Sequence, residues 1–495
     1  MVTSSAKLVP ALSACLLMTA AAELPPVPVP AENPITETKR VLGKILFWDE
    51  QLSSDNTVAC GTCHRPAAGG ADPRVGKHPG TDPGTIDDVQ GSQGIVSLDR
   101  HGRPTEHPLF GFDRQVTART SLSNFGALWA DEAFWDGSAA GEFRDPLTGR
   151  VAIATGGALE IQALTALAND AEMAKHGRTW QELTAKLART TPLDVASDLP
   201  DDVAAAIRDR PGYPELFAAA FGDPAITPVR IAFAIASYER TLLPDQTPWD
   251  RYRAGDLDAM NELELYGWQA MQDFQCVKCH EPPLFTNNDY FNIGLRRAEY
   301  DLGRQAVTGD PEDAGEVRVP SLRNVGLKPR FMHTGEFQTL SAAVSFYRTG
   351  AVLAERDRIP GGGTYAFNMS TVTEGDIHAF LKNALTDRRV HAELFPFDRP
   401  TLRSERHGAD TLAPVAPRDL RAKLEGTSLK LSWRAPADNT GIVDYVLHRN
   451  GGVIALLTDT SFVDAHAPLG AAVTYDVLAR DAARNESPPA RLTIR

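Results

Sequence analysis

The pattern C-x-x-C-H occurs twice in this chain and constrains its fold more than any other feature. "CGTCH" occupies residues 60–64 and "CVKCH" occupies residues 276–280. Two cysteines three residues apart lie on one face of a helical turn, where both thiols can form thioethers to the vinyl groups of one haem. The histidine that follows is then directed at the iron as its proximal ligand. The sequence therefore predicts two covalently bound c-type haems, the first on Cys60, Cys63 and His64, the second on Cys276, Cys279 and His280.

Two other uses of paired cysteines were weighed against haem attachment. A thioredoxin-like dithiol would lie in a strand-helix-strand pattern, which is missing around "CGTC", and the second copy also carries the histidine. A four-cysteine zinc site usually has its pairs about 15–20 residues apart. Here the two pairs are separated by the length of a domain, so haem is favoured.

The remaining cysteine indicates export. Of the five cysteines, Cys15 lies in residues 1–22, where Lys7 precedes an apolar run that ends in three alanines at 20–22. This is the pattern of a cleaved signal peptide, and lipid anchoring at Cys15 is the alternative. After cleavage no cysteine is left for a structural disulfide, as expected when exported thiols bind a cofactor. We expect a periplasmic protein with no membrane span, since no other apolar stretch is long enough to cross a bilayer.

Composition limits the partners. The 495 residues are 42% hydrophobic and 23% charged, enough for two to four domains with cores. The net charge of −14 argues against nucleic acid and anionic membranes, and would suit a basic partner.

The hydrophobic pattern predicts a mainly α protein followed by a small β domain. A proline-rich leader (23–34) precedes an amphipathic helix with Val41, Ile45 and Leu46 on one side, and residues 65–110 read as one irregular loop. Helical patterns return over 158–243, and a helix over 256–275 delivers the second motif. We expect two tandem cytochrome c-like haem domains, an N-terminal one over 35–200 and a C-terminal one over 201–408.

The tail from 416 to 495 changes to a period of two. Apolar residues alternate in "LKLSW" and "TYDVL", and Asn450-Gly451-Gly452 gives a hairpin turn signal. Short alternating strands with a core tryptophan, Trp433, resemble a fibronectin type III sandwich. We expect an interaction or spacer module without chemistry of its own.

Several ordered segments resemble the bacterial dihaem cytochrome c peroxidases and their MauG-type relatives. They are "FWDGS" (134–138), "GALEIQALTALANDAEM" (157–173), "VPSLRNVGLKPRFMHTGEF" (319–337) and "AVSFYRTG" (343–350). The resemblance runs from about residue 38 to 400. It implies that Trp135 passes electrons between the haems, and that Gln162 and Glu172 flank the peroxide site of the first haem. A distal carboxylate oriented by an amide can take a proton from the near peroxide oxygen and return it to the departing one.

The same resemblance leaves several ligands open. The sixth ligand of the second haem is methionine in the peroxidases and tyrosine in MauG, and the equivalent position here is Tyr347. A phenolate ligand lowers the reduction potential compared with methionine. A core role for Tyr347, and ligation by Met332 or His333, are alternatives. For the first haem, His78 is the nearest distal candidate, with His101 and His107 as rivals and a solvated loop histidine as the plain alternative. The family's calcium positions hold Thr120, Lys328 and Arg330, which puts calcium in doubt.

We therefore expect a periplasmic dihaem peroxidase. Hydrogen peroxide would be reduced at the first haem, with electrons from a small donor protein, a cytochrome c or a cupredoxin, relayed through the second haem and Trp135. The alternatives are a MauG-like oxidase of a protein substrate and a non-catalytic dihaem electron carrier. The resemblance also leaves a homodimer open.

Overall fold

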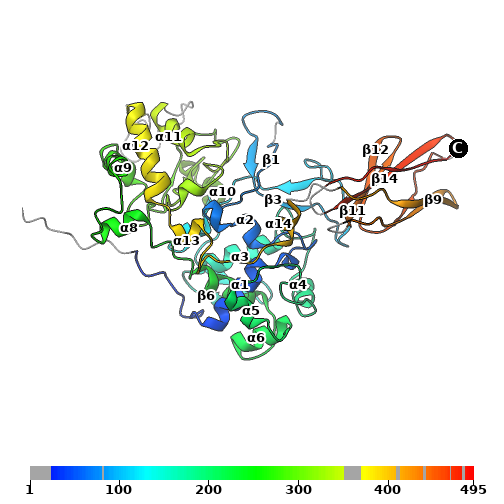
Figure 1. Ribbon diagram of the computed structural model, residues 1–495, viewed down its shortest axis with the longest axis horizontal. Helices are drawn as coiled ribbons and strands as arrows, with labels where there is room; N and C mark the ends of the chain where they lie inside the picture. Colours follow the sequence, from blue (N-terminus) through cyan, green and yellow to red (C-terminus); the bar gives the residue numbers. More distant parts are fainter. Residues whose placement is uncertain are drawn as a thin grey trace, which may run out of the picture.

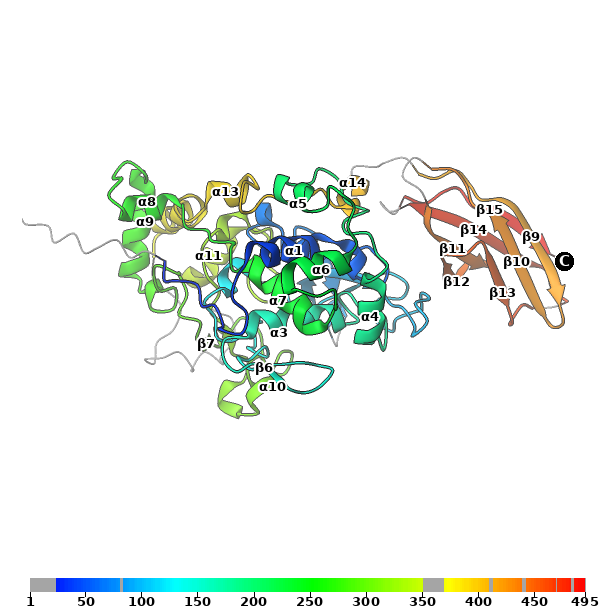
Figure 2. The same ribbon diagram turned by 90° about the horizontal axis from the view of Figure 1, so that it is seen from below.

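The computed structural model describes residues 24–80, 83–349, 369–408, 413–438, 442–468, 470–481 and 485–494. The expected signal peptide and Cys15 lie outside these ranges. Within them, no helix combines the length and apolar character needed to cross a bilayer. Figures 1 and 2 show the helices gathered in one body, with the strands β9 to β15 in an elongated second body at the C-terminal end.

The first helical core is built on α1 (Glu37–Trp48) and α7 (Pro228–Glu239), which pack side by side. Thr36 caps α1 by accepting a hydrogen bond from the Lys39 amide at 3.3 Å. A β-carbon on Gly43 would lie 1.9 Å from the Ala234 carbonyl oxygen, so glycine is needed where the two helices touch. The pair is joined by α3 (Ala158–Ala168), α4 (Trp180–Leu187), α5 (Asp201–Ala206) and α6 (Tyr213–Phe221).

The second helical core lies around Trp249 and Phe285, both buried. Its helix α9 packs against α12, where a β-carbon on Gly267 would lie 2.1 Å from the Asp376 carbonyl oxygen. Its elements are α8 (Pro248–Arg253), α9 (Glu262–Asp273), α11 (Leu340–Thr349), α12 (Thr371–Ala379) and a π-helical turn, Phe380–Ala384. The short helix α10 (Gln305–Thr308) buries no residue and lies outside this core.

Short strands interrupt residues 65–110, which the sequence predicts as one irregular loop. Strand β1 (Gly76–His78) pairs with β2 (Val89–Gly91), and β3 (Gln93–Val96) pairs with β4 (Arg114–Val116). Two further pairs are β5 (Phe143–Arg144) with β6 (Val151–Ile153) and β7 (Tyr290–Phe291) with β8 (Val317–Arg318). Strands this short carry too few residues to show a period in the sequence.

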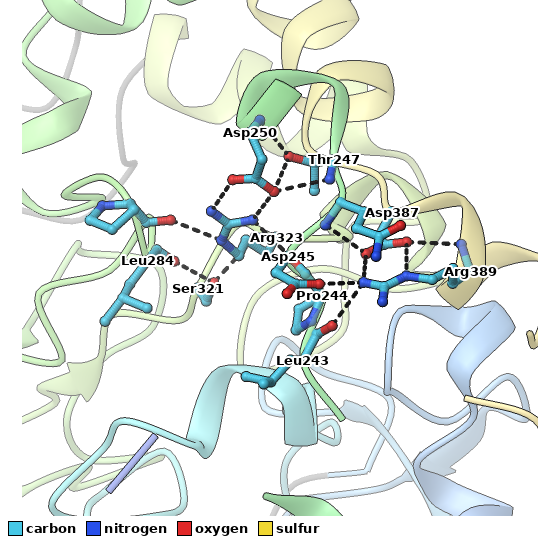
Figure 3. Close-up of polar contacts among 12 residues, drawn as sticks. Leu243, Pro244, Asp245, Thr247, Asp250, Leu284, Ser321, Arg323, Asp387 and Arg389 are labelled. Carbon is cyan, nitrogen blue, oxygen red and sulfur yellow. Dashed lines mark hydrogen bonds and ion pairs between the residues drawn. The ribbon is translucent and has the colours of Figure 1, made fainter. Parts of the chain in front are cut away.

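Two arginines hold the crossover, the stretch between Leu242 and Trp249 where the chain passes from the first helical core to the second (Figure 3). Arg323 donates to both oxygens of Asp250, at 2.7 and 2.9 Å, and to the Pro244 carbonyl at 3.0 Å. Arg389 contacts Asp387 at 2.6 Å and donates to the Leu243 carbonyl at 3.0 Å. The first core includes residues up to Leu242 and, after the second core, Val390, Phe397 and Leu402. The cores therefore meet at this crossover, later in the chain than residue 200.

After α13 (Arg388–His391) and α14 (Arg403–Gly408), the C-terminal body contains two antiparallel sheets. Their strand orders are β13-β10-β9 and β12-β11-β14-β15. Burial alternates along β10, where Leu429, Leu431 and Trp433 are buried, which confirms the predicted β structure of this segment. The strands are β9 (Arg418–Glu425), β10 (Ser428–Arg434), β11 (Ile442–Arg449), β12 (Gly452–Leu457), β13 (Ser461–Asp464), β14 (Val473–Asp481) and β15 (Ala490–Ile494).

Candidate functional site

The first C-x-x-C-H motif forms one helical turn, α2 (Cys60–Cys63), pressed against α1. A β-carbon on Gly61 would lie 2.3 Å from the Trp48 ring, so only glycine lets the turn approach this closely. Cys63 and His64 line a cavity of about 1300 Å³. Pockets for one drug-sized ligand usually measure about 300–1,000 Å³, so this cavity has room for a large prosthetic group.

His64 is held in the form that can bind a metal. Its Nδ1 lies 3.0 Å from the Gly70 carbonyl oxygen, which can only accept a hydrogen bond, so the ring proton is on Nδ1. Burial lowers the pKa of His64, which keeps the ring neutral. The Nε2 lone pair is therefore available, with Nδ1 oriented by a carbonyl as is usual for histidine ligands.

The second motif repeats this arrangement after α9. A 3-10 turn, Cys276–Lys278, carries it, and the Nδ1 of His280 lies 3.2 Å from the Phe285 carbonyl oxygen. Burial lowers the pKa of His280 to about 4. The four cysteines of the two motifs are free thiols. The residues of both motifs thus fit a haem: two unpaired thiols and a neutral, carbonyl-oriented histidine.

Glu172 and Gln162, which the sequence analysis placed beside the first haem, line the same cavity as His64. Burial raises the pKa of Glu172, and a hydrogen bond from Asn169 opposes that rise. The Asn169 Nδ2 donates to the Glu172 Oε1 at 2.7 Å. Sequence reasoning missed Asn169, because an asparagine that ends a helix is a common signal that does not show where its amide points.

Trp135 also lines this cavity and connects the two helical cores. Its indole Nε1 donates to the Thr120 carbonyl oxygen at 2.8 Å, and its own carbonyl accepts from the Arg318 amide at 2.8 Å. The ring lies edge-to-face against His333, with centroids 6.1 Å apart. Thr120 in turn donates its amide to the His333 carbonyl oxygen at 2.9 Å. The indole is therefore fixed by both cores.

An ion cluster lies beside Trp135. Arg119 contacts Asp136 at 2.6 Å and donates to both oxygens of Asp301, at 2.7 and 2.9 Å. Burial alone would raise the pKa of Asp301, but Arg119 outweighs it and lowers that pKa. Arg119 and Asp136 precede the crossover and Asp301 follows it, so this cluster ties the two cores together.

The distal ligand candidates lie as follows. His78 lines the cavity, and its Nδ1 accepts a hydrogen bond from the Gly80 amide at 3.1 Å. In this position its ring proton is on Nε2, so Nε2 offers no lone pair. His107 also lines the cavity, whereas His101 is exposed.

Tyr347, the candidate for the second haem, lies half-buried in α11, with its ring edge-on to Phe346 and the centroids 5.3 Å apart. These ligand assignments stay predictions.

The positions linked to calcium are close to the site. The Thr120 carbonyl is the acceptor for Trp135, and burial lowers the pKa of Lys328 to about 8. Within the described ranges, no group of three or more histidine, cysteine, aspartate or glutamate residues is arranged to hold a metal ion. Calcium therefore stays a prediction in doubt.

Comparison with known proteins places the chain in a family. The family model described as di-haem cytochrome c peroxidase matches residues 37–258. The methylamine utilization protein MauG of Paracoccus denitrificans (strain Pd 1222) is 31% identical over 344 residues, which cover 64% of this chain and 75% of that protein. The chain belongs to the dihaem cytochrome c peroxidase and MauG family. The resemblance stated from its motifs is thereby confirmed.

Other members of the family are similar at comparable levels. Cytochrome c551 peroxidase of Nitrosomonas europaea is 28% identical over 373 residues, covering 74% of this chain and 86% of that protein. Among solved structures, a MauG-like protein associated with microbial copper homeostasis superposes with a TM-score of 0.52 at 23% identity, over 76% of this chain and 96% of the other. That likeness shows a shared fold.

Proposed function

We propose that this protein is a peroxidase that binds two haems covalently through its C-x-x-C-H motifs and reduces hydrogen peroxide at the first. The observation that carries this proposal is one cavity lined by Cys63, His64, Gln162, Glu172 and Trp135. When bound, a haem supplies an iron at which peroxide can bind and be cleaved with electrons from a donor.

In this cavity Glu172 accepts a proton from the peroxide and returns it. As a carboxylate it would accept a proton from one oxygen of hydrogen peroxide and return it to the other, which leaves as water when the oxygen–oxygen bond breaks. Two electrons from the donor and two further protons convert the remaining oxygen into a second water. The carboxyl is half-buried, and its low-polarity surroundings strengthen the polar contacts that it makes. Gln162, on α3, lines the same cavity and would donate a hydrogen bond to the peroxide.

Trp135 supplies the connection for electrons. Its ring contacts His333 of the second core, and its side chain reaches the wall of the first cavity. We propose that electrons from a small donor protein, a cytochrome c or a cupredoxin, enter at the second haem and pass Trp135. Peroxide-dependent oxidation of a protein substrate would use the same cavity and is the alternative that Tyr347 raises.

The remaining assignments complete the proposal. Residues 416–495 would be a fibronectin type III-like sandwich acting as a spacer or interaction module. The chain would be periplasmic after cleavage of residues 1–22.

The test is Glu172→Gln in the full dihaem protein. We expect both haems to be retained, shown by haem staining after denaturing electrophoresis, and peroxide turnover to fall by roughly two to four decades. The control is Glu142→Gln, an exposed carboxyl paired with Arg144, which should turn over normally. Normal turnover in Glu172→Gln would reject this role for Glu172, whereas absence of peroxide turnover in the parent protein would favour a dihaem electron carrier.

A further inference from the structure

We propose that Asn169 is a positioning residue whose side-chain amide fixes the Glu172 carboxylate in its working orientation. This inference depends on the proposed proton-transfer role of Glu172. It replaces Gln162, the amide expected from the sequence, as the group that orients the carboxylate.

The local backbone determines which way the Asn169 amide faces. Asn169 ends α3 in an extended conformation, with φ −83 and ψ 122. Its Oδ1 accepts a hydrogen bond from the Ala171 amide at 2.9 Å, which closes an Asx turn. The oxygen and nitrogen of an asparagine amide are assigned from their partners. Because Oδ1 faces an N–H group, Nδ2 has to face the Glu172 carboxylate, 2.7 Å away.

The segment after Asn169 is held by further hydrogen bonds. The Asn169 carbonyl accepts from the amides of Glu172, Met173 and Ala174, at 3.2, 2.9 and 2.9 Å. The Glu172 carbonyl accepts from the Ile95 amide at 3.1 Å. These backbone hydrogen bonds hold Glu172 independently of the Asn169 Nδ2 group, so losing only that donor should act on the carboxylate.

The electrostatic surroundings make this one donor important. Burial raises the pKa of Glu172, and the Asn169 hydrogen bond is the interaction that opposes it. Other ionisable groups on the cavity wall are the thiol of Cys63, uncharged once alkylated by a haem, the carboxyl of Glu239, and the exposed pair of Asp170 and His176. The wall also carries acidic and basic side chains that do not contribute to the pKa shift of Glu172: Asp87, Asp99, Asp136, Asp301, Arg100, Arg119, Arg296, Arg318, His64, His78, His107 and Tyr300. Asn169 thus favours the carboxylate form that can accept a proton.

The experiment compares Asn169→Asp with Asn169→Ala in the full dihaem protein. Aspartate keeps the oxygen that accepts from the Ala171 amide, so the turn survives, but it replaces the donor by a carboxylate. Alanine removes both the turn and the donor. The low-pH limb of the turnover profile and the infrared band of the Glu172 carboxyl, assigned by its loss in Glu172→Gln, both report the protonation of this group.

The two midpoints are the pH of half-maximal turnover on the low-pH limb and the pH at which half of the Glu172 carboxyl band is lost. We expect both variants to move these midpoints to higher pH, by about one to two pH units for loss of a charge-assisted hydrogen bond. Asn169→Asp should move them further than Asn169→Ala, because a second carboxylate disfavours ionisation. Asn287→Asp is the matched control, since the half-buried Asn287, away from the cavity wall, also accepts from the amide two residues on, at 3.1 Å. It should leave both midpoints unchanged.

The outcomes separate this inference from the proposed function. Unshifted midpoints in Asn169→Asp, with Glu172→Gln inactive, would overturn the inference and leave the proposed function standing. An impaired Asn169→Ala beside a normal Asn169→Asp would assign Asn169 to the turn alone and also overturn it. Normal turnover in Glu172→Gln would overturn the proton-transfer role on which this inference rests, and absence of peroxide turnover in the parent protein would overturn the proposed function itself.

Discussion

At the scale of single residues, a second carboxyl group lies in the wall of the first cavity. Glu239 is 1% exposed, and burial raises its pKa from the ordinary 4.5 to about 8, although Arg240 and Asn124 oppose the rise. In the folded protein it therefore keeps its proton at pH values where the unfolded chain has lost it. Stability then falls as pH rises from about 4.5 to about 8.

Glu239→Gln should remove this part of the pH dependence. At about 1.4 kcal/mol per pH unit, the variant should gain on the parent between pH 5 and pH 9 by roughly 2–5 kcal/mol. The measurement is thermal unfolding of both proteins across this range, with the exposed Glu142→Gln as control. Parallel pH dependences for Glu239→Gln and the parent would show that Glu239 is ionised in the folded state.

Tyr347 stays a prediction of the sequence that redox titration can test. If its phenolate binds the second iron, Tyr347→Met should raise the reduction potential of that haem, because methionine favours the ferrous state. If the ring only packs beside Phe346, the potential should not move, and about 1 kcal/mol of stability should be lost.

Residues differ in how far the sequence could predict them. The prediction for Cys60, Cys63 and His64 comes from their spacing, which thioether attachment and iron ligation require. The prediction for Glu172 comes from family resemblance, since a lone carboxylate carries no signature. The role proposed for Asn169 had no signal in the sequence, because it depends on which way an amide turns in space.

At the scale of elements, the placement of Glu172 depends on a glycine in a neighbouring strand. A β-carbon on Gly94, in β3, would lie 2.0 Å from the Ala171 carbonyl oxygen and 2.8 Å from the Glu172 α-carbon. Gly94→Ala should therefore displace Glu172, and a shift of about 1 Å at a reacting group can cost on the order of a hundredfold in rate. Peroxide turnover and haem staining measure the two effects separately.

The matched control for this strand is Gly375→Ala. Gly375 lies in α12, where an added β-carbon meets nothing within 4 Å. Alanine should stabilise that helix by up to about 1 kcal/mol and leave turnover unchanged. Equal turnover in the two variants would mean that β3 does not position Glu172.

Elements were predictable where their pattern is long enough. Helix α1 carries an amphipathic pattern over twelve residues, which a period of 3.6 reveals. Strands β1 to β4 have three or four residues each and pair across intervening loops. These strands depend on long-range contacts, which the sequence pattern does not show, so the pattern of residues 65–110 predicts only an irregular loop.

At the scale of the whole molecule, the sequence predicts helical regions followed by a β region, but it does not show which residues pack in which hydrophobic core. Phe397 and Leu402 follow the second core in the sequence yet pack in the first. Arg323 and Arg389 hold the crossover through contacts between residues far apart in the chain (Figure 3). Dividing the sequence at residue 200 could not predict either feature, because both depend on contacts between residues far apart in the chain.

The contact between the cores gives the last prediction. Arg119 is 21% exposed and pairs with Asp136 and Asp301, each 16% exposed. Arg119→Met would leave two partly buried carboxylates without their partner, which should cost roughly 2–4 kcal/mol in the free energy of unfolding. Because Thr120, the next residue, accepts a hydrogen bond from the Trp135 indole, electron exchange between the haems should slow as well.

Arg297→Met is the control, since Arg297 and Glu299 form an exposed pair at 3.3 Å and such pairs contribute little to stability. Denaturant unfolding and the rate of electron exchange should separate the two variants. Equal stability in both would mean that the ion pairs of Arg119 contribute no more to folding than an exposed pair does.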